Sequence, residues 1–307
     1  MKELVIKSYS AEGRLAGKLK DWLLLMKPSL SIMVVFSSVI SYLLAPRVVE
    51  FNWGMIGLLF IGGLLVTGSA NALNQVFEKD TDALMKRTAK RPIAAGRMTV
   101  NEGWAFAIIT GLTGAFILGN FFNWTAAGIS LLSLFLYAFI YTPLKKVSAV
   151  SVLVGAVPGA LPCLIGWAAG NDAVTQGGWI LFLFQFMWQF PHFWAIAWVA
   201  HHDYNKAGFK LLPSEEGPTK YTAIQTIIWA LLLIPVTLLP FFTGMCGYAD
   251  VRGMISIALI VLSNIFLVSR CFMLYKNMNV QAARGVMFGS YIYLPIIFLA
   301  LLLSKIT

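Results

Sequence analysis

The chain has 307 residues, of which 59% are hydrophobic and 12% are charged, and its mean hydropathy is +0.77. A soluble globular domain is about half apolar and about one quarter charged, so this composition excludes an ordinary soluble protein and indicates a polytopic membrane protein. A formal net charge of +10 could indicate a nucleic-acid partner. The basic residues are instead placed as membrane topology requires, so we expect no nucleic acid as a partner.

The first segment, residues 1–21, mixes basic and acidic side chains and lacks the small-residue cleavage site of a signal peptide. We interpret it as a basic cytoplasmic arm. Beyond it, apolar runs long enough to cross a bilayer, about 20 residues each, recur nine times. They cover residues 22–45, 53–77, 102–120, 123–141, 147–169, 178–200, 222–243, 253–275 and 286–304. The sequence therefore predicts an all-α polytopic membrane protein, with residues 22–307 forming one domain of nine transmembrane helices.

The distribution of positive charge supports nine crossings. With the N-terminus inside, all but three of the 23 Lys and Arg residues fall on the cytoplasmic side, and the exceptions are Arg47, Arg252 and Lys305. This asymmetry follows the positive-inside rule, and an error of one span would remove it. We expect a cytoplasmic N-terminus and a C-terminus on the opposite side. The arm does not resemble a mitochondrial transit peptide, which favours the plasma (inner) membrane of a bacterium.

Where the second apolar run reaches water, it carries a stripe of polar side chains. The stripe consists of Thr67, Asn71, Asn74, Glu78 and Asp82, which share one face if the helix continues, whereas Asp80 points away. Amide and carboxylate oxygens suit Mg²⁺, which prefers few protein ligands and shares its other positions with water and phosphate. Acids in phase with an intramembrane polar stripe are costly, so Glu78 and Asp82 indicate a functional site.

A basic segment follows the stripe and contains Lys86, Arg87, Lys90 and Arg91. These side chains can neutralise a polyanion held by the metal. Their alternative role is to orient the membrane helices, which is the commoner use of Lys and Arg in such loops. Together with the acidic stripe, they predict a Mg²⁺-diphosphate site at a membrane surface.

Later runs carry further signals. The fourth ends near Pro143, which should stop the helix, and Lys145 and Lys146 follow at the same aqueous face. The fifth contains Pro158 and Pro162 and should be interrupted. Such an interruption can line a cavity, although close packing of small residues between helices is an equally good explanation.

The sixth run carries a second polar stripe. Gln185, Gln189, His192 and Asp203 fall within an arc of about 60° on a helix and lead to the same surface as the first stripe. Pro191 should kink this run just before His192. A lone histidine is usually a satisfied core residue, so a structural role and a substrate-facing role both stay open here. The last three runs are mostly apolar, and we assign them a scaffold role.

At this point the motifs resemble a known family. The N-x-x-x-D/E-x-x-x-D pattern of Asn74, Glu78 and Asp82 resembles the metal signature of the UbiA-type intramembrane prenyltransferases. The haem O synthase branch of that family is the most similar, and further blocks resemble it. These blocks are residues 80–97, 141–145, 155–167, 188–193 and 203–213, so the resemblance covers most of the chain in matching order.

The resemblance implies a bundle of nine helices around a central cavity open to the cytoplasmic side. Asn74, Glu78 and Asp82 would be metal ligands and catalytic residues, with Asp203 as the acid of a second metal motif. Many relatives outside the haem branch have two acids in that motif, whereas this chain has one. The residues expected to bind diphosphate are Lys86, Arg87, Arg91, Lys145 and Lys206, with Tyr141 nearby.

The implied reaction is the Mg²⁺-dependent transfer of a farnesyl group from farnesyl diphosphate to a vinyl group of haem b, which gives haem O. The product serves haem A synthesis for a terminal oxidase, with a possible hand-over to a haem A synthase. His192, Trp188 and Gln189 would bind the acceptor beside membrane lipid. His192 could ligate the iron and Trp188 and Trp194 could stack on the porphyrin, although interfacial placement explains such aromatics equally well.

Two other functions stay open. A related prenyltransferase acting on an aromatic quinone precursor, such as 4-hydroxybenzoate, would share the diphosphate site but not the segment around His192. A nine-span transporter could use the polar stripes as an ion site near the bilayer midplane. Against a transporter, the acids lie at the ends of spans beside cations, and no inverted repeat is evident.

Overall fold

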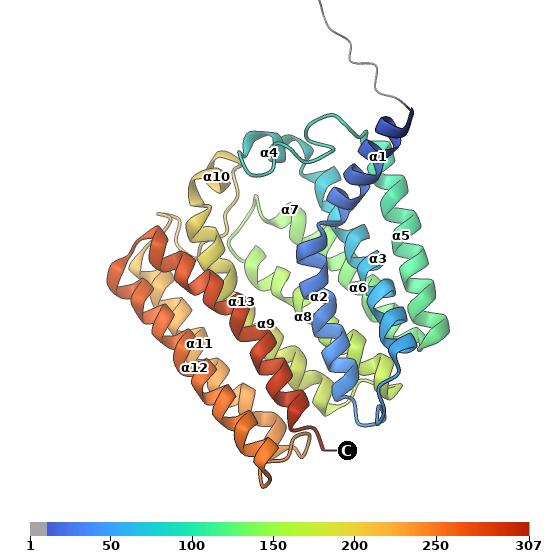
Figure 1. Cartoon of the computed structure of the whole chain (residues 1–307). Helices are drawn as coiled ribbons and strands as arrows, with labels where there is room; N and C mark the ends of the chain where they lie inside the picture. Colours follow the sequence, from blue (N-terminus) through green and yellow to red (C-terminus); the bar gives the residue numbers. More distant parts are fainter. Residues whose placement is uncertain (1–10, 307) are drawn as a thin grey trace, which may run out of the picture.

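The computed structural model describes residues 11–306, with side chains from residue 16 onward, and the regular secondary structure of this part is helical apart from one isolated bridge pair (Figure 1). The long helices are α1 (Ala11–Met26), α2 (Pro28–Leu44), α3 (Trp53–Phe77), α5 (Val100–Phe121), α6 (Trp124–Phe135), α8 (Ser151–Asn171), α9 (Gln176–Val199), α11 (Lys220–Phe242), α12 (Val251–Asn277) and α13 (Val280–Leu303). Short helices follow three of them: α4 (Lys79–Leu84), the π-helix η1 (Leu136–Tyr141) with α7 (Thr142–Leu144), and α10 (His201–Lys206). Residues 1–10 of the expected arm lie outside the described part.

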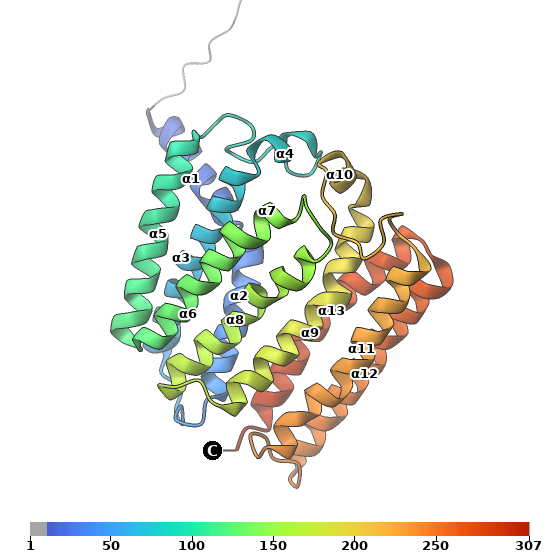
Figure 2. The same cartoon turned by 180° about the vertical axis from the view of Figure 1, so that it is seen from behind.

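The number of membrane crossings agrees with the sequence. Within residues 11–306, eight segments are long and apolar enough to cross a membrane alone, and the count is nine if the bent pair α1–α2 forms one span. In Figures 1 and 2, α1, α4 and α10 lie at one end of the bundle and the C-terminus lies at the other. The loops predicted to be cytoplasmic therefore lie at one end of the bundle, and the C-terminus, predicted to be on the opposite side of the membrane, lies at the other end.

The first predicted span, residues 22–45, is not one straight helix. Its two parts meet at an angle of 48°, and Lys27 between them has a left-handed conformation with φ of 49°. Pro28 explains the break, because a proline ring disfavours the helical conformation for the residue before it. The break removes Lys27 from the regular run and turns its side chain toward α3.

Two amide side chains of α3 hold this break together, Asn71 of the predicted polar stripe and Gln75 outside it. The side chain of Asn71 donates to the carbonyl of Met26 at 3.1 Å, and that of Gln75 donates to the carbonyls of Leu24 and Leu25 at 3.1 and 3.2 Å. Carbonyls at the end of a helix need such partners in an apolar setting. Part of the stripe predicted to face a ligand therefore has a structural task.

The predicted interruption at the prolines of the fifth run was wrong, because α8 continues through Pro158 and Pro162. Helix α9 is continuous through Pro191, and the kink expected there stays a prediction. Pro162 cannot donate to the carbonyl four residues earlier, that of Pro158, but Ser133 Oγ of α6 donates to it at 3.0 Å. A neighbouring helix thus supplies the missing hydrogen bond. The prediction at Pro143 was closer, since α7 ends one residue later at Leu144.

Helix α8 lies among α2, α6 and α9, and most of its side chains are buried. Its glycines permit this close packing: a Cβ on Gly166 would lie 1.8 Å from the carbonyl oxygen of Ser38 in α2. Near the other end of α8, a Cβ on Gly155 would lie 2.5 Å from the ring of Tyr141. Small residues at such positions let helices approach in a membrane, where lipid is as apolar as the helices.

Candidate active site

The polar stripe of α3 ends in a turn. Helix α3 stops at Phe77, Glu78 links it to α4, and Asp82 lies within α4. Although the helix does not continue, Glu78 and Asp82 stay buried, with exposed fractions of 4% and 0%. Asp80 between them is exposed, as the sequence predicted. The turn therefore keeps both acids at the inner side of the α3–α4 junction.

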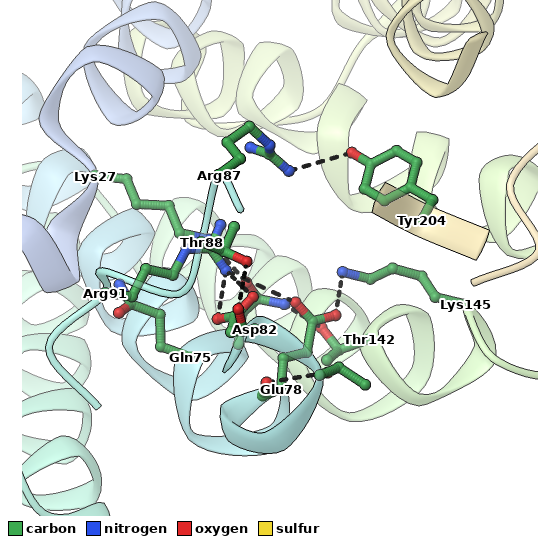
Figure 3. Close-up of polar contacts among 12 residues, drawn as sticks. Lys27, Gln75, Glu78, Asp82, Arg87, Thr88, Arg91, Thr142, Lys145 and Tyr204 are labelled. Carbon is green, nitrogen blue, oxygen red and sulfur yellow. Dashed lines mark hydrogen bonds and ion pairs between the residues drawn. The ribbon is translucent and has the colours of Figure 1, made fainter. Parts of the chain in front are cut away.

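Both buried carboxylates contact cations that come from later segments. Arg91 Nη1 donates to Asp82 Oδ1 and Oδ2 at 2.7 and 2.6 Å, and it lies 4.0 Å from Glu78 Oε2. Lys145 Nζ lies 2.5 Å from Glu78 Oε1 (Figure 3). The structure thus joins four predicted site residues from the α3–α4 region, the loop after α4 and the end of α7.

A fifth group, Lys27, completes this cluster and was missed by sequence analysis. Its Nζ donates to Asn74 Oδ1 at 2.8 Å, and Asn74 Nδ2 lies 3.3 Å from Thr142 Oγ1. The signal that could have revealed Lys27 is its place directly before Pro28, inside an apolar run. We call Lys27, Asn74, Glu78, Asp82, Arg91 and Lys145 the charged cluster.

By formal charge, the charged cluster has three basic side chains, Lys27, Arg91 and Lys145, against the two acidic side chains Glu78 and Asp82. Burial raises the pKa of Glu78, but the attraction of Lys145, with Lys27 and Arg91, outweighs burial and holds that pKa below its usual value. Burial lowers the pKa of Lys145, yet the Glu78 carboxylate raises it above its usual value. Such a cluster suits the predicted ligand, a diphosphate with a bound Mg²⁺ ion.

The π-helix η1 brings Tyr141 to the cluster. The ammonium group of Lys145 lies 4.7 Å from the centroid of the Tyr141 ring, and Gly155 of α8 backs that ring. Single turns of π-helix are rare and often occur at functional sites, because they shift the register of the side chains that follow. No pattern in the sequence predicted this turn.

The second predicted loop meets the first at the same end of the bundle. Arg87 Nη2 donates to the hydroxyl of Tyr204 in α10 at 3.4 Å (Figure 3), and Met85 packs with Ala207 and Phe209. Asp203 precedes Tyr204 and is partly exposed. In residues 11–306 no three His, Cys, Asp or Glu side chains lie close enough to hold a metal, so the role of Asp203 as a ligand stays a prediction.

Two predicted diphosphate-binding residues stand apart from the cluster. Lys86 and Lys206 are exposed, and their side chains form no hydrogen bond or ion pair with any residue that the structure describes. They belong to the same two segments as Arg87 and Tyr204. Their predicted contact with a diphosphate is untested by this arrangement.

A cavity of about 780 Å³ runs into the bundle beside the charged cluster. Lys27, Arg87, Arg91 and Tyr141 are among its polar lining residues, and apolar residues of α2, α3, α6 and α8 form most of its wall. The residues predicted to bind the acceptor also line it: Trp188, Gln189 and His192. The predicted stacking role of Trp194 has no such support, because Trp194 packs against Phe190, at 5.4 Å between ring centroids.

Comparison with known proteins places this arrangement in a family. The model described as the UbiA prenyltransferase family matches residues 34–292. The chain belongs to this family. Curated relatives named "Protoheme IX farnesyltransferase", from Cytophaga hutchinsonii and Flavobacterium psychrophilum, are each 42% identical to it. The matches cover 95% and 93% of this chain, and 100% and 94% of the relatives.

Solved structures show the same UbiA fold. A digeranylgeranylglyceryl phosphate synthase superposes with a TM-score of 0.75 at 21% identity, covering 94% of this chain and 98% of the other. A UbiA homolog from Archaeoglobus fulgidus, bound to GPP and Mg²⁺, gives 0.69 at 15% identity, covering 92% and 99%. The predicted fold and the resemblance to the UbiA prenyltransferases are therefore confirmed.

Proposed function

We propose that this UbiA-family protein transfers a farnesyl group from farnesyl diphosphate to a vinyl group of haem b, which gives haem O. One observation carries the proposal: a buried, positively charged cluster borders a largely apolar cavity that His192 also lines. The near-complete match to proteins named protohaem IX farnesyltransferase supports the choice of donor and acceptor. It favours haem over a quinone precursor.

We assign Mg²⁺ binding to Asn74, Glu78 and Asp82, with Asp203 as a further ligand. The donor set fits a hard cation, because it consists only of carboxylate and amide oxygens. Glu78 and Asp82 are buried and contact Lys145 and Arg91, so a bound Mg²⁺ would share these carboxylates with the two basic side chains. When bound, Mg²⁺ supplies positive charge that stabilises the leaving diphosphate.

The cationic side chains would act on the donor. Arg91, Lys145 and Lys27 stabilise the negative charge that builds on the diphosphate as the allylic C–O bond breaks. Preorganised charges of this kind are usually the largest contribution that a site makes to catalysis. Arg87 is held by Tyr204 at the entrance and extends this positive surface.

The apolar wall would act on the prenyl group. It excludes water from the allylic cation until the cation meets the electron-rich vinyl carbon of the acceptor. The new C–C bond leaves a cation on the former vinyl group, and addition of water with loss of a proton gives the hydroxyethylfarnesyl side chain. His192, Trp188 and Gln189 hold the porphyrin in this proposal.

We also propose the cellular setting. The protein is a multi-pass membrane protein, and the end with α4 and α10 would face the bacterial cytoplasm, because most basic residues lie at that end. Residues 22–307 would act as one prenyltransferase domain. Haem O released into the bilayer would pass to a haem A synthase.

The decisive experiment measures product mass. Purified protein in detergent is incubated with haem b, farnesyl diphosphate and Mg²⁺, and the extracted porphyrin is analysed by mass spectrometry. We expect haem O with Mg²⁺ and none after chelation with EDTA. A protein that leaves haem b unchanged and prenylates 4-hydroxybenzoate instead would contradict the proposal, and Mg²⁺-independent flux of a solute would support a transporter.

A further inference from the structure

Arg270 lies in a part of the bundle that the proposed function does not use. It belongs to α12, which packs mainly against α11 and α13 and forms an edge of the bundle in both views (Figures 1 and 2). Arg270 stands seven residues before the end of α12 at Asn277, about 10 Å along the axis. The same stretch of α12 exposes the apolar side chains Ile265, Phe272 and Met273. This face therefore contacts lipid, and it carries a cation inside the end of the helix.

The guanidinium group of Arg270 has no acid partner among the described residues. Its one hydrogen-bond contact there is from Nη1 to the sulfur of Met273 at 3.9 Å, and a thioether is a weak acceptor. Its Cζ lies 4.9 Å from the centroid of the Phe266 ring, which adds a cation–π contact. Arginine has five N–H donors, so most of them are left for a ligand. A cation beside lipid is costly without an acceptor.

Glycines of α13 make room for this side chain. A Cβ on Gly289 would lie 3.5 Å from Arg270 Cγ, and a Cβ on Gly285 would lie 3.9 Å from Arg270 Cδ. Gly285 is the closer of the two to the start of α13 at Val280. The arginine side chain therefore runs along α13 toward the α12–α13 loop. This direction brings its charged end toward the level of the lipid headgroups.

The charged residues of α12 and α13 are all positive. Lys276 and Arg284 are exposed near the α12–α13 loop, and residues 251–307 contain no Asp or Glu. Glu215 and Glu216, in the loop before α11, form no ion pair with any residue that the structure describes. This surface complements an anion and would repel the positive group of a zwitterionic headgroup.

We propose that Arg270, with Arg284 on the neighbouring helix, binds the phosphate group of an anionic phospholipid at the groove between α12 and α13. A planar guanidinium can donate two parallel hydrogen bonds to phosphate oxygens. Basic pockets between transmembrane helices suit anionic headgroups in the same way. Neither arginine lines the cavity beside the charged cluster, so this site is separate from the candidate active site.

The test measures lipid binding to the full-length protein. The protein in detergent is titrated with phosphatidylglycerol or with phosphatidylcholine, and native mass spectrometry counts the bound lipids. We expect the wild type to bind phosphatidylglycerol more tightly than phosphatidylcholine. Arg270→Gln should weaken phosphatidylglycerol binding about 10-fold, as for the loss of a hydrogen bond to a charged group. Arg284→Gln should weaken it about 5-fold, the contribution of one basic residue near an anionic lipid.

Two further variants separate a built site from general attraction to a basic surface. Arg252→Gln removes the same charge at an exposed position near the other end of α12 and should bind phosphatidylglycerol as the wild type does. Gly285→Leu keeps every charge but fills the groove beside Arg270, so it should weaken binding. Thermal unfolding checks the fold: without added lipid, Arg270→Gln should unfold at the wild-type temperature. Phosphatidylglycerol should then stabilise the wild type but not this variant.

Three outcomes would overturn the inference. The first is equal binding of the two lipids by the wild type. The second is a preference for phosphatidylglycerol that survives in Arg270→Gln or in Gly285→Leu. The third is a loss in Arg252→Gln as large as that in Arg270→Gln, which would show attraction without a site. None of these measurements involves farnesyl transfer, so the lipid site and the proposed function can fail independently.

Discussion

Two buried polar clusters in this bundle differ in charge and in surroundings. The charged cluster combines three cations and two carboxylates at the edge of a cavity. The other cluster is neutral and joins the last three helices: Tyr293 donates to Asn264 at 2.8 Å, and Asn264 donates to Thr237 at 3.0 Å. None of its three residues lines the cavity.

The difference separates polar residues with a structural role from those with a ligand-binding role. In the neutral cluster each polar group has a hydrogen-bond partner, and Thr237 donates to a carbonyl of its own helix at 2.9 Å. Such a cluster needs no ligand and holds helices together. The charged cluster carries more positive than negative charge and opens to a cavity, which is the arrangement of a ligand site. The two should respond differently to substitution.

The largest effect is expected at Asp82. Asp82→Asn keeps the shape of the side chain but removes the charge that pairs with Arg91 and that we assign to the metal. We expect the rate of farnesyl transfer to fall about 10³-fold, as for the loss of a principal electrostatic group. Asp80→Asn, at the exposed acid two residues earlier, should keep wild-type activity. Equal losses in both variants would refute the distinction between these acids.

A smaller loss is expected at Lys145, which is buried against Glu78, whereas Lys146 is exposed. Lys145→Ala should lower kcat/KM for farnesyl diphosphate about 10²-fold, because the leaving group loses one preorganised cation. Lys146→Ala should change it by less than about 2-fold. Steady-state kinetics with both variants checks this, and a fall caused by Lys146→Ala alone would reverse the assignment.

Substitution of Gly155, which packs against the Tyr141 ring, should reduce activity less than removal of the charge of Asp82 or Lys145. Gly155→Ala would place a methyl group 2.5 Å from the Tyr141 ring and push it toward Lys145. We expect activity to fall about 10-fold, since small displacements of positioning groups are costly in catalysis. Gly128→Ala in α6 meets nothing within 4 Å and is the matched control. Comparison of turnover and expression of both proteins tests the effect, and normal activity of the Gly155 variant would contradict it.

The neutral cluster should affect stability and leave catalysis intact. Tyr293→Phe removes the hydroxyl that donates to Asn264, and interhelical hydrogen bonds in membrane proteins contribute about 0.6 kcal/mol on average. We expect a small fall in the free energy of unfolding, measured by denaturation in detergent, with turnover unchanged. Tyr221→Phe, at an exposed tyrosine in α11, should change neither quantity. A large loss of turnover in Tyr293→Phe would remove the contrast between the two clusters.

Much of the architecture was accessible from the sequence. Each crossing needs about 20 apolar residues, and the basic loops report their side, so hydropathy and charge identify nine spans. The acids Glu78 and Asp82 were recognisable because carboxylates are costly beside an apolar run. The resemblance to the UbiA-type enzymes rested on their spacing, and the family match confirms it.

Other features depend on neighbours that are distant in the sequence. The sequence around Pro162 predicts a helix break. In the structure Ser133 of α6 donates to the carbonyl of Pro158, which Pro162 cannot do, and α8 continues. In the sequence, Lys27 is a single basic residue near the start of the first apolar run, and only the kink before α2 directs it to Asn74. Ser290 has no distinguishing sequence context, and its contact with His192 arises only because α13 packs against α9.

The sequence by itself determined which segments enter the membrane, which end carries the positive charge, and which acids belong to a polar site, because each follows from the local cost of placing a group in lipid. Only the tertiary structure decided which basic side chain contacts which carboxylate, which amides bind the carbonyls at the end of α1, and which hydroxyl contacts His192. These depend on contacts of a few ångströms between helices, which no local pattern encodes.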